Sequence, residues 1–400
     1  MAAQNQTLKT QIFAKASFDA YDTFMVKEVR SRRFKHAEMM GILRTLQASM
    51  NDLLTIQQVG VSSEGRSINL LALGRGKKKI FMWSQMHGDE PTATMGIFDM
   101  LSYIALHRST AEVQSILSDT TLLIIPMLNP DGVERFQRRN AQGIDINRDA
   151  AQLRTNEAKI LKQTRDSFSP EFGLNLHDQE PRYTVGSSGK VATIALLAPA
   201  IDRKKSENAV RLRAKRIASV LVDILSPYID GHISRYDDSF EPRAFGDNIQ
   251  KWGTSTVLIE SGGAKNDPEK MSIRKLNCTA LLGICYAVAI GEVDDAEISK
   301  YEQLADNTKN LYDVIIRGIT LTFENGAAPI VSDVGINLEE SVDGGVVRWR
   351  GKVVDIGDLS TFTSFRAFDG KGKKLGSDAV KLEGYVEVET LSSEFREMKD

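Results

Sequence analysis

Short apolar runs alternate with longer helical ones over residues 68–290 of this 400-residue chain. The short runs have the length of strands and are rich in β-branched residues, whereas the long ones repeat their apolar residues at helical spacing. This alternation is typical of an α/β fold, in which helices cover both faces of a mixed, mostly parallel sheet. We predict strands at 68–73, 79–84, 121–127, 173–177, 192–197 and 254–259, and helices at 92–106, 157–168, 206–224 and 268–290.

The two ends of the chain have a different character. A helical pattern runs from about residue 18 to 50, and we expect this segment to pack on the α/β domain. After residue 293, short β-branched or alternating runs are separated by Gly, Asp and Lys turns, at 315–323, 345–354, 364–368 and 384–390. We therefore predict three regions: an N-terminal helical segment at 1–50, an α/β domain at 51–295 and a small, all-β, sandwich-like domain at 300–400.

Composition excludes several classes of partner. With 42% hydrophobic and 26% charged residues the chain can bury a sizeable core, and a net charge of −2 gives no electrostatic reason to expect nucleic acid or a membrane surface. No run reaches the roughly 18 consecutive apolar residues of a membrane span. Cys278 and Cys285 lie about 10 Å apart by helical rise, so we expect buried free thiols. No N-terminal secretory signal is visible, which favours the cytoplasm unless a leader was removed.

The first candidate site is the segment His87-Gly-Asp-Glu90. It follows the apolar run 80–83, so both side chains emerge at the carboxyl end of a strand, where open α/β sheets bind ligands. Imidazole and carboxylate are zinc ligands, and a catalytic zinc needs three protein ligands and one open position. Taken alone, the pair could equally be a capping Glu beside a polar turn His. His177 ends another apolar run in the same way, which makes it the candidate third ligand.

Two later segments carry groups that would serve such a metal. Arg138, Arg139 and Arg148 follow the turn 129–132, and Asn147 directly precedes the last of them. Arg binds carboxylates through two parallel hydrogen bonds, and Asn can donate to the same oxygens, although surface arginines are the plain alternative.

Glu260 ends the β-branched run 254–259, before Ser261 and two glycines. A carboxylate at that edge could take a proton from a metal-activated water and return it to a leaving nitrogen. The alternative is an edge Glu that hydrogen-bonds a loop.

Together these motifs resemble the zinc carboxypeptidases of the funnelin type. The resemblance covers roughly residues 50–290 and rests on the order, spacing and strand-end context of five motifs: His-Gly-Asp-Glu at 87–90, Asn-Pro-Asp-Gly at 129–132, the run 138–148, the lone His177, and Ile-Glu at 259–260.

The resemblance implies one Zn²⁺ per chain and a role for each matching residue. Zinc would be held by His87, Glu90 and His177, with Glu260 as the general base and acid. Arg138 would polarise the scissile carbonyl, with Arg139 as the neighbouring candidate for that role. Asn147 and Arg148 would hold the terminal carboxylate of the substrate.

The sequence departs from the family pattern at several positions. Asp149-Ala150 follows Arg148 where the family often has an aromatic residue two positions after the Arg. The family's active-site Tyr has no secure match, and Tyr236, about 24 residues before Glu260, is the nearest candidate. The segment 240–251 is expected to line the pocket for the substrate side chain, and its residues indicate no basic, acidic or aromatic preference. Asp149 and Asp178 are candidate partners for the ring nitrogens turned away from the metal.

The leading hypothesis is a zinc-dependent carboxypeptidase that acts on a peptide, or a peptide-like amide, with a free terminal carboxylate. The first alternative is a zinc-dependent deacylase of N-acyl amino acids, similar to aspartoacylase and succinylglutamate desuccinylase, although those relatives lack the segment 129–148 in this form. The second is a non-catalytic binding protein on the same scaffold, against which the filled ligand and base positions argue.

Overall fold

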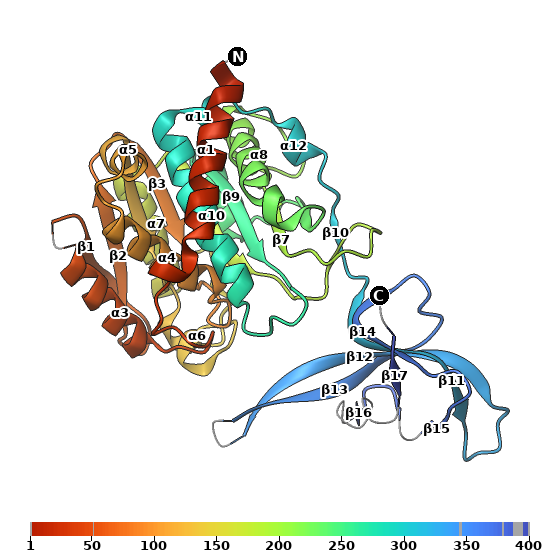
Figure 1. Ribbon diagram of the computed structural model, residues 1–400. Helices are drawn as coiled ribbons and strands as arrows, with labels where there is room; N and C mark the ends of the chain where they lie inside the picture. The colour runs from red at the N-terminus through yellow and green to blue at the C-terminus, as the bar shows by residue number, and fades with distance from the viewer. Residues whose placement is uncertain (1, 51, 344–345, 378–379, 387–394, 399–400) are drawn as a thin grey trace. The chain divides into compact units, whose positions relative to one another are not determined.

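The computed structural model describes residues 2–50, 52–343, 346–377, 380–386 and 395–398 (Figure 1). The chain divides into two compact units. The first consists of Met1–Pro181 and Ala192–Asn307, and the second of Arg182–Val191 and Thr308–Asp400. The predicted boundary near residues 295–300 therefore lies a few residues early, and the prediction that 51–295 forms one continuous domain is wrong at 182–191. That segment leaves the first unit because its strand β6 (Thr184–Val185) pairs with β10 (Asn307–Thr308).

An eight-stranded mixed sheet forms the centre of the first unit, in the order β1-β2-β4-β3-β5-β9-β7-β8. The strands are β1 (Thr55–Val61), β2 (Ser67–Gly74), β3 (Lys78–Trp83), β4 (Thr120–Ile125), β5 (Phe172–Asp178), β7 (Ile194–Leu197), β8 (Ile233–Arg235) and β9 (Ser255–Ser261). The central strands β4, β3, β5 and β9 run parallel to one another. Because β3, β5 and β9 are adjacent and parallel, their carboxyl ends meet at one edge of the sheet.

Helices cover both faces of this sheet, as predicted (Figure 1). The alternation of side chains along β3 shows why both faces need a cover: Ile80 and Met82 belong to one buried cluster, and Phe81 and Trp83 to the other. The first cluster includes residues of α1 (Ala2–Asp19), α3 (His36–Ser49), α4 (Thr92–Leu106), α5 (Ala111–Asp119), α8 (Ala209–Ile229) and α10 (Met271–Ile290). The second includes residues of α7 (Asn156–Phe168) and α9 (Phe245–Lys251).

The shorter helices of this unit are α2 (Tyr21–Phe24), α6 (Pro130–Arg135), α11 (Glu292–Asp295) and α12 (Ser299–Glu302), with one 3₁₀ turn at Ile146–Arg148. Helix α10 is long and apolar enough to cross a bilayer by length and composition. However, 89% of its most apolar window is buried inside the protein, as expected of a core helix.

The predicted helix over residues 18–50 is interrupted. Helix α1 ends at Asp19, the short α2 covers Tyr21–Phe24, and the next helix begins only at His36. A buried ion pair between Arg274 and Asp99 explains the break, because it takes up backbone groups of the intervening segment. Val26 N donates to Asp99, and Arg274 donates to the carbonyls of Val26 and Val29. Those groups are therefore unavailable for the hydrogen bonds of a continuous helix.

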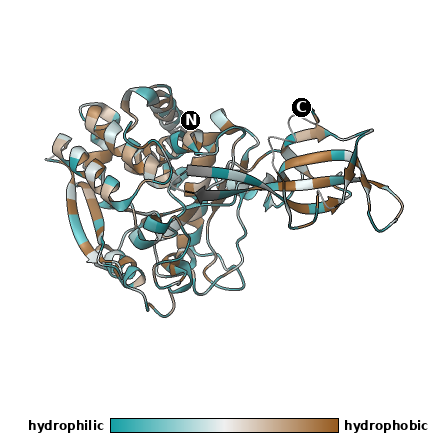
Figure 2. Cartoon of the chain, turned by 90° about the horizontal axis from the view of Figure 1, so that it is seen from below, coloured by the Kyte–Doolittle hydropathy of each residue, from teal (hydrophilic) through white to brown (hydrophobic). Residues whose placement is uncertain are grey.

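In the second unit, the described strands from β11 onward form one seven-stranded sheet in the order β16-β13-β12-β11-β14-β17, with β15 on β11, while β6 belongs to the separate two-stranded sheet with β10. The all-β character of this part of the chain is confirmed, and its sandwich-like packing stays a prediction. The strands are β11 (Leu311–Thr322), β12 (Ile330–Asp343), β13 (Val346–Gly357), β14 (Thr363–Asp369), β15 (Lys374–Gly376), β16 (Tyr385–Val386) and β17 (Arg396–Glu397). Figure 2 shows hydrophobic residues along these strands. Of the predicted runs, residue 345 and residues 387–390 lie outside the described residues.

Candidate metal centre

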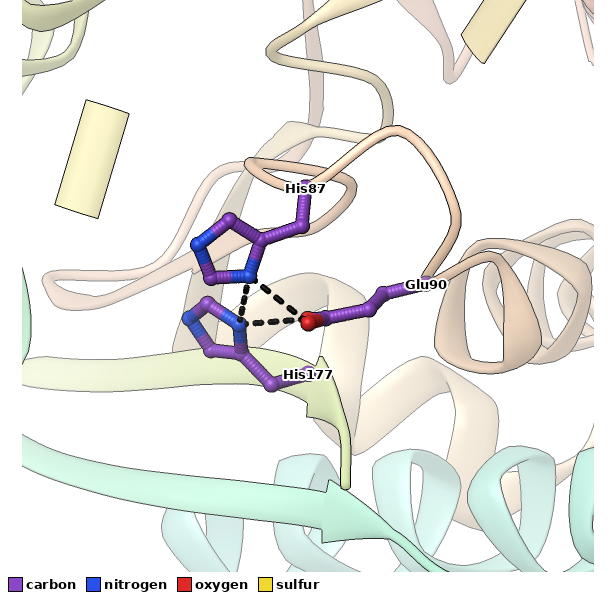
Figure 3. A group of neighbouring side chains, drawn as sticks. All are labelled: His87, Glu90 and His177. Atoms are coloured by element: carbon purple, nitrogen blue, oxygen red, sulfur yellow. Dashed lines mark hydrogen bonds and ion pairs between the residues drawn. The ribbon is translucent and has the colours of Figure 1, made fainter. Parts of the chain in front are cut away.

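Three ligating side chains converge at the common edge of β3, β5 and β9 (Figure 3). His87 and Glu90 lie on the loop between β3 and α4, and His177 lies near the end of β5. Glu90 Oε1 is 2.8 Å from His87 Nδ1, and Glu90 Oε2 is 2.7 Å from His177 Nδ1. The two Nδ1 atoms are 3.1 Å apart, and all three residues are buried. The structure thus brings together the three residues that the sequence predicted as ligands.

This cluster has the dimensions of a zinc site. Zinc–ligand distances of about 2.0–2.1 Å in a tetrahedron place neighbouring ligand atoms roughly 3.3 Å apart. The observed separations of 2.7–3.1 Å are close to that value. A metal-bound His usually donates its other ring N–H to a carboxylate. His87 fits this pattern, since its Nε2 lies 3.1 Å from Asp145 Oδ1.

The charges of the cluster favour a cation. Burial by itself would lower the pKa of His87, but the neighbouring Glu90 and Asp145 carboxylates outweigh it and raise that pKa to about 9. Burial would raise the pKa of Glu90, yet the two imidazoles hold it well below its usual range. Burial also lowers the pKa of His177. An ionised carboxylate facing two ring nitrogens is therefore built to hold a positive charge, whether a proton or a metal ion.

Two glycines let the metal loop pack against the turn at 129–132. A Cβ on Gly88 would lie 2.0 Å from the carbonyl carbon of Gly132, and a Cβ on Gly132 would lie 2.4 Å from Asn129 Nδ2. Asn129 ties the two segments together, since its side chain accepts from Gly132 N at 2.9 Å and donates to Met86 O at 3.2 Å. The Asn-Pro-Asp-Gly motif thus supports the loop that carries His87 and Glu90.

Glu260 lies beside the cluster, at the end of β9. It is the register partner of His177 on the adjacent strand and is only 7% exposed. Its Oε2 atom has no hydrogen-bond partner among the described residues. Burial raises the pKa of Glu260 well above its usual value, and the negative charge of Glu90 adds to the effect. A carboxyl group in this setting can take up and hold a proton.

Of the two neighbouring arginines, only Arg138 reaches the cluster among the contacts described. Its Nη1 lies 3.2 Å from Glu90 Oε1, and its Nε lies 3.0 Å from Asp145 Oδ2. The side chain is nevertheless 44% exposed, so it faces both the cluster and solvent. Arg139 is exposed and donates to Gly143 O at 3.0 Å instead.

Asn147 and Arg148 lie two and three residues after Asp145, and a backbone contact ties Asn147 to that carboxylate. Asn147 N donates to Asp145 Oδ1 at 2.9 Å, and Asn147 Oδ1 accepts from Phe245 N, at the start of α9, at 2.8 Å. Arg148 is 39% exposed, and its Nε lies 3.6 Å from a carboxylate oxygen of Glu241. The position of Arg148 thus suits the capture of a carboxylate from solvent.

Comparison with known proteins agrees with this geometry. Residues 39–182 match the model of a family described as zinc carboxypeptidase. The resemblance to the zinc carboxypeptidases is confirmed. Carboxypeptidase 2 of Trichophyton rubrum is 24% identical over 331 residues, which cover 73% of this chain and 56% of that protein. Carboxypeptidase 2 of Trichophyton equinum is 30% identical over 151 residues, which cover 35% of this chain and 28% of that protein.

Solved structures share the zinc carboxypeptidase fold. Bovine thrombin-activatable fibrinolysis inhibitor, solved in complex with tick carboxypeptidase inhibitor, aligns with a TM-score of 0.53 at 14% identity, over 68% of this chain and 100% of that chain. A metallo-carboxypeptidase from Burkholderia cenocepacia aligns with a TM-score of 0.52 at 16% identity, over 66% of this chain and 70% of that chain. The chain spans about half, or less, of the length of the curated relatives it matches. The family match ends before Glu260.

The candidate site contains one residue that the sequence did not predict, and the two carboxylates predicted as partners of the ring nitrogens lie elsewhere. The partner of His87 is Asp145, whereas Asp149 and Asp178 were the candidates. Asp149 instead accepts from Arg154 N and Thr155 N, in the segment just before α7, and Thr155 is the residue that caps the helix. Asp178 accepts from Thr92 and Lys270. The one sequence signal that could have pointed to Asp145 is its place two residues before Asn147.

Tyr236 keeps the status of a prediction. Its backbone N–H donates to Leu196 O at 2.9 Å, beside β8, and its side chain is half-buried. The Asp149-Ala150 departure is explained in part, because the Asp149 carboxylate holds Arg154 and the N-cap residue Thr155, just before α7. The segment 240–251 contains α9, and its Asp247 and Asn248 are buried.

Proposed function

We propose that this protein is a zinc-dependent carboxypeptidase, which hydrolyses the C-terminal amide bond of a peptide or a peptide-like substrate. One observation carries the proposal: the buried Glu260, with an unpartnered oxygen, stands next to the His87–Glu90–His177 cluster as the register partner of His177. A metal-ligand set and a proton-accepting carboxyl at one sheet edge are the two parts that metal-assisted amide hydrolysis requires.

The side chains divide the chemistry among them. Zinc, held by His87, Glu90 and His177, would polarise the scissile carbonyl and make a water acidic enough to lose a proton near neutral pH. Glu260 takes that proton, because its carboxylate is desolvated and basic, and then donates it to the departing nitrogen. Arg138 offers N–H donors and a positive charge toward the oxygen on which negative charge develops.

Asn147 and Arg148 give the site its preference for a chain end. Arg148 supplies the positive charge. The Asn147 side-chain oxygen accepts from Phe245 N, so the NH₂ group is the part of this amide that would donate to a substrate. A free terminal carboxylate bound there places the last amide bond at a fixed distance from the metal cluster. The substrate class is therefore a peptide or peptide-like amide whose terminal carboxylate is free.

The test compares three substrates and two variants of the purified protein. Zinc content near one ion per chain is expected, together with hydrolysis of an N-blocked dipeptide that has a free C-terminus. The same dipeptide with a C-terminal amide should react poorly. Glu260→Gln should lower kcat by about 10²–10⁴-fold, the usual worth of a general base. Glu157→Gln is the matched control, because Glu157 is an equally buried carboxyl on α7 that is not part of the site.

Other outcomes would redirect the proposal. Preferential cleavage of an N-acyl amino acid would favour the deacylase alternative. Zinc binding without hydrolysis of any of these substrates would favour a binding protein. Full activity of Glu260→Gln would exclude the mechanism given above. A cytoplasmic location stays a prediction from sequence.

A further inference from the structure

A buried lysine lies behind the proposed active site and takes no part in the roles assigned above. Lys270 is 6% exposed and stands at the start of α10. Its ammonium group donates to Ser261 O at 2.9 Å, to Asp178 Oδ2 at 3.2 Å and to Gln179 O at 3.4 Å. A single buried cation thus binds three oxygens from two different strand ends.

Those oxygens directly follow two site residues. Asp178 and Gln179 come after His177 at the end of β5, and Ser261 comes after Glu260 at the end of β9. The two strands pair in register there, with His177 opposite Glu260. Ser261 O also accepts from Gln179 N at 3.1 Å. The ammonium group therefore joins the strand ends one residue beyond the metal ligand and the general base.

Asp178 extends this network to the third segment of the site. Its side chain accepts from Thr92 Oγ1 at 2.5 Å, and Thr92 is the first residue of α4, two residues after Glu90. Its backbone N–H donates to Glu90 Oε2 at 3.2 Å. The segments that carry Glu90, His177 and Glu260 are all tied to the Asp178–Lys270 pair.

The local structure of α10 gives no other reason for a lysine here. A cation at a helix N-terminus is disfavoured by the helix dipole, and Lys270 also has a left-handed backbone, with φ of +54°. The N-terminal N–H groups of the helix are capped by Asp267, which accepts from Met271 N and Ser272 N. Burying an ammonium group is costly unless it is paired. Only the contacts with the strand ends offset these penalties.

We propose that Lys270, through Asp178 and the carbonyl of Ser261, is a positioning residue that sets the spacing between the metal cluster and Glu260. The expected loss of kcat rests on the proposed carboxypeptidase function, whereas the expected loosening of the ends of β5 and β9 does not. Without the ammonium group, the ends of β5 and β9 lose their common donor. Glu260 then samples positions from which it reaches the reacting water less often.

The chain offers a matched control. Lys78, at the start of β3, also places its ammonium group on two backbone carbonyls, Val288 O at 2.8 Å and Ala289 O at 3.2 Å. It lies at the opposite end of its strand from the metal loop. Lys270→Met and Lys78→Met therefore remove the same kind of contact, near the site and away from it. Lys270→Arg keeps a charged donor, and Asp178→Asn weakens the pair without removing a buried side chain.

Three readouts are measured on folded, zinc-loaded protein. Lys270→Met should lower kcat about 10–100-fold and weaken zinc affinity, the usual effect of removing an outer partner of a metal site. KM should change less than about twofold, because Asn147 and Arg148 are untouched by the change. Lys270→Arg should recover most of kcat. Hydrogen exchange should quicken in peptides covering 177–180 and 259–262 in Lys270→Met, and not in Lys78→Met.

Wild-type kcat together with unchanged exchange at both strand ends in Lys270→Met would overturn the proposal. An equal loss in Lys78→Met would also overturn it, because the effect would then be general destabilisation. If Lys270→Met does not fold, Asp178→Asn takes its place with the same expectations. If the wild-type protein hydrolyses no peptide, the proposed function fails, and the exchange data alone decide whether Lys270 positions the strand ends.

Discussion

Replacing Arg274 alone should destabilise the first unit more than replacing both Arg274 and its ion-pair partner Asp99 with uncharged residues. Arg274 and Asp99 form an ion pair that is sealed from water, with side chains 2% and 0% exposed. The guanidinium donates to both carboxylate oxygens, at 2.6 and 2.7 Å, and to the carbonyls of Val26 and Val29, each at 2.8 Å. Asp99 also accepts from Tyr21 Oη at 2.6 Å and from Val26 N at 2.8 Å.

The magnitude follows from what each variant leaves behind. Arg274→Met leaves an unpaired buried carboxylate, and breaking a buried pair in this way costs about 3–5 kcal/mol. Two carbonyls also lose a donor, which adds about 1–3 kcal/mol for each one that water does not reach. In the double variant Asp99→Asn/Arg274→Met the same carbonyls are orphaned, but no charge is buried. The single Asn oxygen can still accept from Val26 N, and the Asn NH₂ group can donate to Tyr21 Oη, which also accepts. The double variant should therefore regain at least about 1 kcal/mol relative to Arg274→Met.

Urea unfolding monitored by circular dichroism, together with calorimetry of thermal unfolding, can measure the difference in stability between the two variants. The transition of the first unit is analysed separately, because the two units need not unfold together. Faster proteolysis within residues 25–35 should accompany the loss of stability in Arg274→Met. Lys300→Met serves as a control, since it breaks an exposed pair with Asp223 and should cost less than about 1 kcal/mol. A double variant less stable than Arg274→Met would refute the reasoning.

Three further outcomes are expected. Burial raises the pKa of Asp247 from 3.8 to about 7, so the native state holds this proton more tightly than the unfolded chain. The tighter binding stabilises the native state by about 4 kcal/mol below pH 3.8, and this contribution is lost as the pH rises through 7. Asp247→Asn keeps the acceptor for Glu241 N and should flatten that decline in a pH series of unfolding curves, and an unchanged slope would contradict it. Gly88→Ala should lower the free energy of unfolding by about 1–3 kcal/mol and weaken zinc binding, because the new Cβ meets the backbone of Gly132. Its control is Gly41→Ala in α3, whose Cβ meets nothing within 4 Å and which should raise the free energy of unfolding by up to about 1 kcal/mol. Thermal unfolding measures both changes. Free zinc at 100 times its Kd should add about 2.7 kcal/mol to the free energy of unfolding, and a chelator should abolish this gain. A zinc titration that leaves the free energy of unfolding unchanged would show that zinc does not bind the native state.

The sequence predicted the metal cluster because its signal is local. His87 and His177 each end an apolar run of strand length, and the carboxyl ends of adjacent parallel strands share an edge. Closeness in sequence did not predict which carboxylate hydrogen-bonds to a candidate ligand. Asp178 follows a ligand directly yet turns to Lys270, while Asp145 reaches His87 from a loop 58 residues away.

The failures elsewhere have tertiary causes. The non-helical stretch between Phe24 and His36 depends on Asp99 and Arg274, which lie far along the chain and bind the backbone of Val26 and Val29. Strand β12 was not predicted, since Asp333, Glu339 and Glu340 interrupt its apolar pattern. The excursion at 182–191 was invisible because its partners, which include Asp313 and the carbonyl of Leu338, appear more than 120 residues later.

That excursion has a consequence for synthesis of the protein. Residues 182–191 leave the ribosome roughly 120 residues before strand β11, and at 5–20 residues per second this delay is on the order of 10 seconds. During that interval neither Asp313 nor Leu338 has been made, although Arg182 lies only five residues beyond His177, one of the three candidate metal ligands. The first unit must therefore assemble its sheet edge with an unsatisfied loop attached, and the loop settles only when the last quarter of the chain has emerged.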